Sequence, residues 1–305
     1  MMASNFTSLA DLAQQLARER HADTASVIKE LLHYEILQAL VESGSSSHLV
    51  FQGGTALRLC YGGIRYSEDL DFAGGTDFDA SSMQPFIEHI TQSVGNRYGL
   101  FIEVAEHHRQ AILDPRLKSS ACGSISVIRW KAKVRIPQLD RSAKQAYLIQ
   151  VVVAKIPAYS CELLRLRTMS ESVPYAYRAI CLNSESAEEI LADKIIALGA
   201  RPYIKQRDLW DIHMLAQDLV PLNVKMVWNK INDYHLDNAA FCQNLHNRIV
   251  QLDDANEVSA FREEMLRFLE GQHQRIIQDV STVREILAMV AKVVRTLLDQ
   301  LTIEE

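Results

Sequence analysis

The sequence has few cysteines and no close cysteine pair. Its five cysteines are scattered over 305 residues, and none belongs to a C-x-x-C motif. An odd count without close spacing argues against a disulfide framework or a zinc site and favours reduced thiols in a cytoplasm. The ten histidines also lack the spacing of metal ligands. We therefore predict a cytoplasmic protein that needs neither disulfides nor structural zinc.

The chain also lacks an excess of positive charge and a long apolar run. Its formal net charge is -6, so a nucleic acid would have to bind to a local basic surface. The N-terminus has no apolar core typical of a signal peptide, and the most apolar late segment, 286–298, is interrupted by Lys292 and Arg295. We expect neither secretion nor membrane contact. With 48% hydrophobic residues, the composition is that of a globular protein large enough for an enzyme.

One stretch, residues 51–72, organises the chain and reads FQGGTALRLCYGGIRYSEDLDF. The preceding apolar residues, 48–51, predict a strand that runs directly into Gly53 and Gly54. Glycine can adopt positive φ, and its bare backbone lets a phosphate approach closely. A short helix is predicted next, over residues 55–61.

A second strand, predicted over residues 65–72, carries two aspartates. Asp69 and Asp71 are two positions apart, so their side chains project from the same face of the strand. Paired carboxylates are a hard-oxygen site that suits Mg²⁺, the ion that compensates the charge of a triphosphate. Acidic pairs also occur on solvated strand faces. The double glycine before this pair favours the metal-binding interpretation.

This layout of glycine turn, short helix and acidic strand resembles the nucleotidyltransferase fold of the DNA polymerase β superfamily. More narrowly, GGTAL and RYSEDLDF resemble the AbiEii/MenT-type nucleotidyltransferases, which are toxins of bacterial toxin–antitoxin and phage-defence systems. The resemblance implies an α+β fold, with a mixed sheet, flanking helices and a C-terminal helical domain. The predicted divisions are N-terminal helices over 1–44, a nucleotidyltransferase domain over 45–183, and a helical domain over 184–305 that completes the active site.

Residues 124–137 show the clearest strand periodicity in the chain. Apolar residues alternate with cations, and the cations fall on one face: Arg129, Lys131, Lys133 and Arg135. Two interpretations are open. The charges either keep a solvent-facing edge strand soluble, or contact a triphosphate or a nucleic-acid backbone.

The strand predicted over residues 147–156 contains no acidic residue. It is apolar on both faces, which is typical of a central strand. In the polymerase β superfamily a third metal-binding carboxylate usually lies on such a strand, whereas here the run reads IQVVVAK. Three explanations are open: two carboxylates suffice with Gln150 or water completing the shell, another acid such as Glu103 comes near, or activity is impaired.

A lysine lies where the sequence predicts a buried helix face. Ser186 and Glu189 form a capping box that opens a helix over residues 187–199. The apolar residues of this helix form one stripe, and Lys194 falls in its middle. A buried ammonium group needs a partner, unless its aliphatic stem carries the charge to solvent. Spacing alone leaves both interpretations open.

The resemblance gives this lysine a function. The downstream signature of the family resembles an acidic and apolar helix with a lysine, followed by R-D-x-x-D, and this chain has EEILADKIIAL and then RDLWDIH. Asp208 and Asp211 are three apart and therefore face the same way on a helix, with Arg207 beside them. The resemblance implies that Lys194 contacts the triphosphate and that one of the two aspartates orients it or the acceptor hydroxyl.

The same resemblance implies the remaining groups of the predicted site. Mg²⁺ or Mn²⁺ is expected between Asp69 and Asp71, where it would bridge the phosphates of the substrate NTP. Backbone donors of the glycine turn and nearby side chains would hold those phosphates. The residues predicted to bind the nucleotide are Gly53, Gly54, Thr55, Ser67, Lys194 and Arg207.

We therefore predict a toxin-type nucleotidyltransferase that transfers NMP from an NTP to an acceptor hydroxyl and releases pyrophosphate. The resemblance implies that the acceptor is the 3′ end of tRNA and that a cognate antitoxin is a partner. Two alternatives are an enzyme that modifies a protein or small molecule, and a non-catalytic nucleotide- or RNA-binding module. The missing third carboxylate would suit the non-catalytic binding module. An enzyme with another acceptor stays open because one fold can serve many acceptors.

Overall fold

The computed structural model describes residues 8–113, 117, 125–136, 146–168 and 170–301. It divides into two compact units. The first, here the sheet unit, comprises Met1–Arg109, Ser126–Ser184 and Glu270–Gln272. The second, here the helical unit, comprises Gln110–Ile125, Glu185–Leu269 and His273–Glu305.

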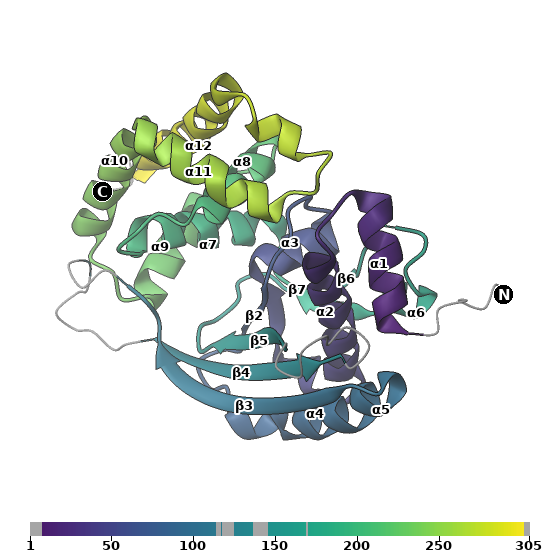
Figure 1. Cartoon of the computed structure of the whole chain (residues 1–305). Helices are drawn as coiled ribbons and strands as arrows, with labels where there is room; N and C mark the ends of the chain where they lie inside the picture. Colours follow the sequence, from purple (N-terminus) through teal and green to yellow (C-terminus); the bar gives the residue numbers. More distant parts are fainter. Residues whose placement is uncertain (1–7, 114–116, 118–124, 137–145, 169, 302–305) are drawn as a thin grey trace. The chain divides into compact units, whose positions relative to one another are not determined.

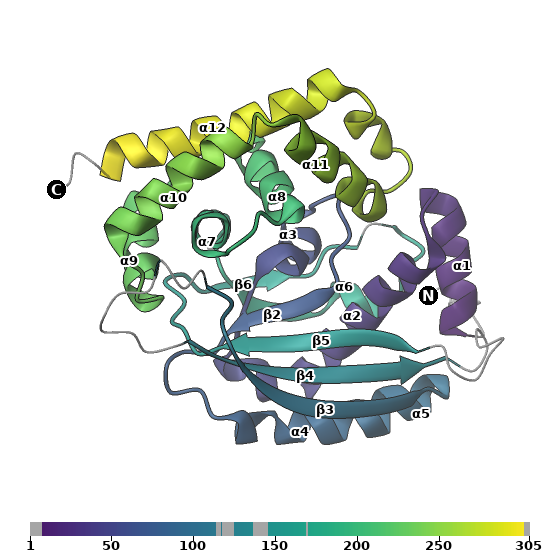
Figure 2. The ribbon, with the colours of Figure 1, turned by 60° about the vertical axis from the view of Figure 1, so that its left-hand side comes forward.

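Within the described residues, the sheet unit contains a seven-stranded sheet in the order β3-β4-β5-β2-β1-β7-β6. Figure 2 shows β3, β4, β5 and β2 side by side in this order. Strands β1 and β2, β4 and β5, and β6 and β7 pair antiparallel, whereas β2–β5 and β1–β7 are parallel. This mixed sheet confirms the predicted α+β class. The strands are β1 (Val50–Gln52), β2 (Asp69–Ala73), β3 (Phe101–Gln110), β4 (Ser126–Arg135), β5 (Tyr147–Ala154), β6 (Glu162–Arg165) and β7 (Cys181–Ser184).

Helices flank this sheet, and α2 packs against β5 (Figure 1). Both predicted N-terminal helices form, each opened by a side-chain cap, Ser8 for α1 and Asp23 for α2. The sequence of residues 82–98 predicts one helix, and the structure has three consecutive helical segments over residues 84–98. The helical elements of this unit are α1 (Leu9–Arg20), α2 (Thr24–Glu42), α3 (Gly53–Tyr61), α4 (Gln84–His89), the π-helical turn Ile90–Val94, α5 (Gly95–Tyr98), α6 (Tyr175–Arg178), and short 3-10 turns at Ser45–His48 and Ala80–Met83.

The two faces of the central strands differ in burial. One face is almost fully buried and consists of apolar side chains, among them Leu70, Phe72, Trp130, Val151 and Val153. The opposite face carries the alternate residues of the same strands, which are partly exposed and include Asp69 and Asp71 of β2, the cations of β4, and Leu148, Gln150 and Val152 of β5. The alternation predicted over residues 124–137 is therefore real, and it orients the cations of β4 away from the core.

Two expectations about local structure were wrong. The sequence of residues 162–167 predicts a helix or turn, but Glu162–Arg165 instead form strand β6, which pairs antiparallel with β7. The polar sequence of residues 106–123 predicts an irregular segment, but its first residues belong to β3, which continues to Gln110. Pairing with a neighbouring strand outweighs weak local preference in both places. Residues 114–116 and 118–124 of that segment lie outside the described residues.

The helical unit is built around α7, which contacts α8, α9 and α10 (Figure 2). Ser186 caps α7 by accepting a hydrogen bond from the Glu189 amide, as the capping box predicts. Burial extends to most of α7, consistent with its central place. The helices are α7 (Ala187–Ala200), α8 (Gln206–Gln217), α9 (Val224–Asp233), α10 (Asn238–Gln251), α11 (Ala255–Phe268), a 3-10 turn at Gln274–Ile277, and α12 (Val280–Leu301).

Two expectations about the chain as a whole can be compared with the structure. Cys60, Cys161, Cys181 and Cys242 are free thiols, and Cys122 lies outside the described residues. Within the described ranges, none of the helices combines the length and hydropathy that crossing a bilayer requires.

A buried ion network stabilises the sheet unit. Glu30 of α2 accepts hydrogen bonds from Arg20 of α1, at 2.5 Å, and from Arg58 of α3. Arg58 also donates to Glu270 across 3.0 Å and to the carbonyl oxygen of Gly63 across 3.3 Å. All four charged side chains are less than a tenth exposed. Glu30 therefore compensates two buried guanidinium groups at once.

We expect Glu30→Ala to lower the free energy of unfolding by about 3–5 kcal/mol, because it leaves buried arginines without their shared partner. Denaturant titration of the two proteins measures this difference. Glu88→Ala is the matched control, since Glu88 is an exposed glutamate of α4 whose hydrogen bond to Gln84 is also exposed. Equal stability of the two variants would show that the network contributes nothing.

Candidate active site

Asp69 and Asp71 lie on the partly exposed face of β2, in two rows of side chains that cross the sheet. In the first row, Asp69 pairs with Gln150 of β5, which pairs with Lys131 of β4. In the second row, Asp71 pairs with Val152, which pairs with Arg129. Directly opposed residues share a face, so the acidic pair and these two cations face the same side.

The glycine turn lies against this acidic pair. Gly53 is the first residue of α3 and has φ +78, a conformation that few other residues adopt. A Cβ atom at this position would lie 3.1 Å from Oδ2 of Asp71, so glycine lets the helix start approach the carboxylate. A Cβ on Gly54 would overlap the guanidinium group of Arg65 and lie 3.1 Å from Oγ of Ser67. The N-terminus of α3, whose amides favour anions, therefore begins beside Asp71.

Side chains around the turn hold it in place. The Thr55 hydroxyl is buried and donates a hydrogen bond to the carbonyl oxygen of Asp69 at 2.5 Å. This contact ties α3 to β2. Arg65 is also buried, and its Nη1 donates to the carbonyl oxygen of Tyr66. Sequence reasoning gave Arg65 no function, although it lies within the quoted motif RYSEDLDF.

Gln150 lies on β5, the central strand on which a third metal-binding carboxylate is expected from the resemblance. Its Nε2 donates a hydrogen bond to Oδ1 of Asp69 across 2.9 Å, so the side chain orients that carboxylate. Glu103 lies on β3, which is separated from β2 by β4 and β5. Three strand spacings amount to about 14 Å, so Glu103 lies too far across the sheet to join the pair. Among the described residues, no group of three or more acids, histidines or cysteines could hold a metal ion.

The cations of β4 do not lie on an edge of the sheet. Strand β4 lies between β3 and β5, so the interpretation as a solvent-facing edge strand is wrong. The four side chains form no ion pair with any carboxylate within the described part of the chain, and the buried Nε of Arg129 has no hydrogen-bond partner there. We define these four as the β4 stripe: Arg129, Lys131, Lys133 and Arg135. Unpaired cations beside two carboxylates suit a substrate that carries several negative charges.

The residues present fit a divalent cation. Asp69 and Asp71 offer carboxylate oxygens from one strand face, and positions two apart on a strand are about 7 Å apart at Cα. Mg²⁺ typically takes one or two protein carboxylates and completes its shell with water and substrate phosphate oxygens. A two-carboxylate site is therefore chemically sufficient. The hydrogen bond from Gln150 would keep Asp69 oriented for such a role.

A second charged cluster lies inside the helical unit. Nζ of Lys194 on α7 lies 2.8 Å from Oδ1 of Asp208 and 2.8 Å from Oδ2 of Asp211, both on α8. All three side chains are buried. The predicted burial of Lys194 is confirmed, and its ammonium group is held by a partner rather than carried to solvent. Both aspartates contact it equally closely, as their i, i+3 spacing allows.

Arg201 is a member of this cluster that sequence reasoning missed. Its Nη1 pairs with Oδ2 of Asp208. Burial alone would raise the pKa of Asp208, but Lys194 and Arg201 outweigh it and hold that pKa well below its ordinary value. Asp208 therefore stays ionised and bridges two cations. The sequence signal, an arginine just beyond the end of α7, is too common to identify it.

Arg207 lies outside this cluster. Its Nε pairs with Glu264 of α11 at 3.1 Å, and its guanidinium carbon lies 4.2 Å from the centre of the Phe268 ring. Adjacent residues on a helix point about 100° apart, so Arg207 and Asp208 face different neighbours. Nucleotide binding by Arg207 remains a prediction.

This mixed sheet, with an acidic pair opposite a glycine-led helix start, places the chain among nucleotidyltransferases. The family model described as "Nucleotidyl transferase AbiEii toxin, Type IV TA system" matches residues 35–289. The chain belongs to this family of nucleotidyltransferase toxins. No curated protein sequence matches it significantly.

Solved structures support the same fold. MenT4, a nucleotidyltransferase toxin from Mycobacterium tuberculosis H37Rv, is 18% identical with a TM-score of 0.55, over 91% of this chain and 89% of that one. JHP933 from Helicobacter pylori is 18% identical with a TM-score of 0.50, over 90% of this chain and 96% of that one. Likeness at this identity concerns the fold, while the family assignment supports an enzyme rather than a non-catalytic binding module.

Proposed function

We propose that the enzyme transfers NMP from an NTP to the 3′ end of tRNA, with a divalent cation held by Asp69 and Asp71. The observation that carries this proposal is the register of the sheet. It aligns the two carboxylates with Lys131 and Arg129 on one face. A site that binds and activates a nucleoside triphosphate needs carboxylates that hold a metal cation and separate basic side chains that attract the phosphates.

The chemistry is a displacement at the α-phosphorus. The acceptor hydroxyl oxygen forms a new bond to this atom, the bond to the β-phosphate bridging oxygen breaks, and pyrophosphate and a proton leave. Asp69 and Asp71 would hold a divalent cation, which would compensate the negative charge of the phosphates. The amides of Gly53, Gly54 and Thr55 and the hydroxyl of Ser67 bind phosphate oxygens, so most of the catalytic effect comes from positioning and charge stabilisation.

Lys194 serves the same nucleotide in this proposal. Its side chain is held between two carboxylates, so its position is fixed before the substrate arrives. An ammonium group so oriented stabilises negative charge on the triphosphate without a further loss of side-chain freedom. Asp211 or Asp208 orients the lysine, and one of them accepts a hydrogen bond from the attacking hydroxyl.

The acceptor is tested by labelling. We expect purified enzyme, incubated with each α-labelled NTP and total tRNA, to transfer label to RNA from at least one NTP. Prior periodate oxidation of the tRNA, which destroys the terminal diol, should abolish the signal. Label that stays off RNA and appears on protein or a small molecule would instead support the alternative transferase. A type IV toxin–antitoxin family implies a cognate antitoxin, whose co-expression should relieve any toxicity.

The β4 stripe makes a graded prediction. Arg129 and Lys131 lie in the rows of the aspartates, whereas Lys133 and Arg135 lie progressively further along the strand at about 3.4 Å per residue. We therefore expect alanine substitution to raise the KM for NTP most at Arg129 and Lys131, less at Lys133 and least at Arg135. Steady-state kinetics of the four single variants measures this order. Equal effects, or a reversed order, would show that the stripe does not meet the triphosphate.

A further inference from the structure

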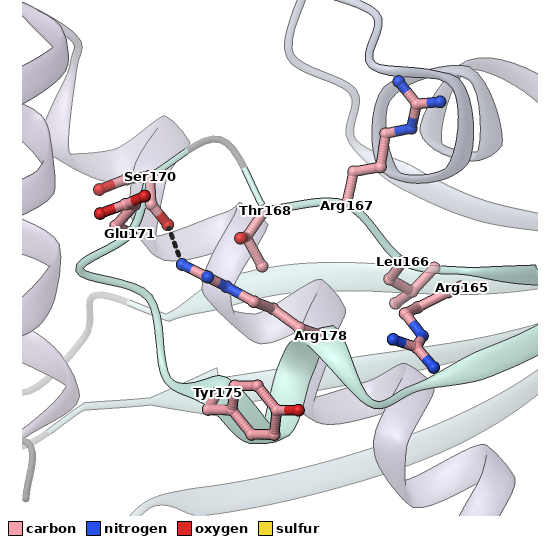
Figure 3. A pocket seen from close by; sticks show the side chains of 8 residues that line it. All are labelled: Arg165, Leu166, Arg167, Thr168, Ser170, Glu171, Tyr175 and Arg178. Atoms are coloured by element: carbon pink, nitrogen blue, oxygen red, sulfur yellow. Dashed lines mark hydrogen bonds between the residues drawn. The ribbon is translucent and has the colours of Figure 1, made fainter. Parts of the chain in front are cut away.

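A pocket of about 480 Å³ opens in the sheet unit beside β6 and α6 (Figure 3). Its lining includes three arginines, Arg165 of β6, Arg167 just beyond it, and Arg178 at the end of α6. Tyr175 also lines the pocket and is 78% exposed. None of these residues belongs to the site described above. The function assigned so far leaves this basic pocket unexplained.

The charges of the three arginines are only partly balanced by nearby carboxylates. Within the described part of the chain, none of the three forms an ion pair with a carboxylate. Glu171, an exposed residue, is the acidic member of the lining. Nη2 of Arg178 donates to the carbonyl oxygen of Ser170 across 3.3 Å, while its buried Nε has no hydrogen-bond partner among the residues that the structure describes. Glu19 of α1 lies beside the lining, where it accepts hydrogen bonds from the hydroxyls of Ser170 and Ser172, both at 3.1 Å. Three cations against two anions leave the pocket with a net positive charge, which attracts a polyanion.

The cations are spread along the pocket. In Figure 3 the side chain of Arg178 extends toward Ser170 and Glu171, whereas that of Arg167 points in another direction. Groups that do not converge on one point suit an anion with several separated charges better than a single phosphate. The hydroxyl of Thr168 adds a hydrogen-bonding group, and the exposed ring of Tyr175 offers a surface on which a base can stack.

We propose that this pocket binds the sugar–phosphate backbone of the RNA acceptor. The inference rests on the proposed function in taking RNA as the acceptor, and it adds where that RNA is held. Strand β6 is the edge strand on the opposite side of β2 from β4. It lies three strand spacings from β2, about 14 Å across the sheet. The acceptor and the triphosphate are thus bound on different sides of the acidic pair.

The test is the double variant Arg165→Gln/Arg167→Gln, since both side chains are exposed and can be changed without disturbing the core. Fluorescence anisotropy with labelled tRNA at several salt concentrations measures affinity and its salt dependence. We expect weaker binding and a slope of log K against log salt that falls by about 2, one for each lost phosphate contact. The KM for RNA should rise several-fold, and the KM for NTP should stay unchanged.

The matched control is Lys292→Gln/Arg295→Gln, which removes the same charge from exposed positions of α12. Its affinity for RNA and its salt slope should equal those of the wild type. If both double variants bind and label RNA equally well, the RNA-binding role of the pocket is contradicted, while the proposed acceptor is not. A wild type that neither binds nor labels RNA contradicts the proposed acceptor as well.

Discussion

Asp69→Asn and Asp71→Asn are each expected to lower kcat by about 10³-fold or more, because in the proposed mechanism each aspartate would supply a negative charge that holds the divalent cation at the phosphates. Both side chains lie on the partly exposed face of β2. Asparagine keeps the shape of aspartate, and at position 69 it can still accept the hydrogen bond from Gln150. The fold should therefore remain intact. Transfer of α-labelled nucleotide, measured across a range of Mg²⁺ and Mn²⁺ concentrations, provides the rate.

The control for this pair is Asp77→Asn. Asp77 is an exposed aspartate in the loop after β2, so its substitution removes the same charge from the same unit. We expect it to leave kcat and the metal dependence unchanged. Thermal unfolding of all three variants excludes a loss of structure. Substantial activity in Asp69→Asn, at wild-type stability, would reject the assignment of this residue as a metal ligand.

Lys194→Ala is expected to abolish transfer and also to destabilise the helical unit. The lysine is buried between Asp208 and Asp211, so its removal leaves Asp211 without that cation and Asp208 dependent on Arg201. Breaking a buried ion pair in this way costs about 3–5 kcal/mol. The loss of activity alone is thus ambiguous. Kinetics must be measured at a temperature where denaturant titration shows the variant to be folded.

Lys230→Ala separates the two effects. Lys230 is another buried lysine of the helical unit, and its Nζ lies 2.8 Å from Glu189 and 2.6 Å from Asp193. Burial would lower the pKa of Lys230, but the surrounding carboxylates outweigh it and raise that pKa, so Lys230 stays charged. We expect a comparable loss of stability and a kcat near wild type. Lys194 has only a structural role if the folded Lys194→Ala protein keeps wild-type kcat. The same conclusion follows if Lys230→Ala lowers kcat as much as Lys194→Ala does.

Much of this fold could be predicted because its signals are local. The alternation of cations and apolar residues over β4 follows from the two-residue period of a strand. Ser186 and Glu189 fix the start of α7, since a capping box involves residues only three apart. The burial of Lys194 follows from the helical period in the same way. Each of these features depends on neighbours along the chain.

The features that could not be predicted are those set by distant pairing. Nothing near residues 162–165 specifies a strand, which forms because β7 lies beside it. The interior position of β4 follows from the order of the sheet, and the spacing of its cations suits an edge strand equally well. Gln150 orients Asp69 because β2 and β5 pair in one particular register. Such contacts join residues far apart in sequence.

The most direct test is a crystal structure of the enzyme with Mn²⁺ and an NTP analogue that cannot transfer its α-phosphate. Our account predicts an anomalous signal from Mn²⁺ between the carboxylates of Asp69 and Asp71, phosphates at the Gly53 and Gly54 amides, and Nζ of Lys194 within hydrogen-bonding distance of a phosphate oxygen. A metal bound elsewhere, or a triphosphate that Lys194 does not touch, would contradict the shared site on which the proposed reaction depends.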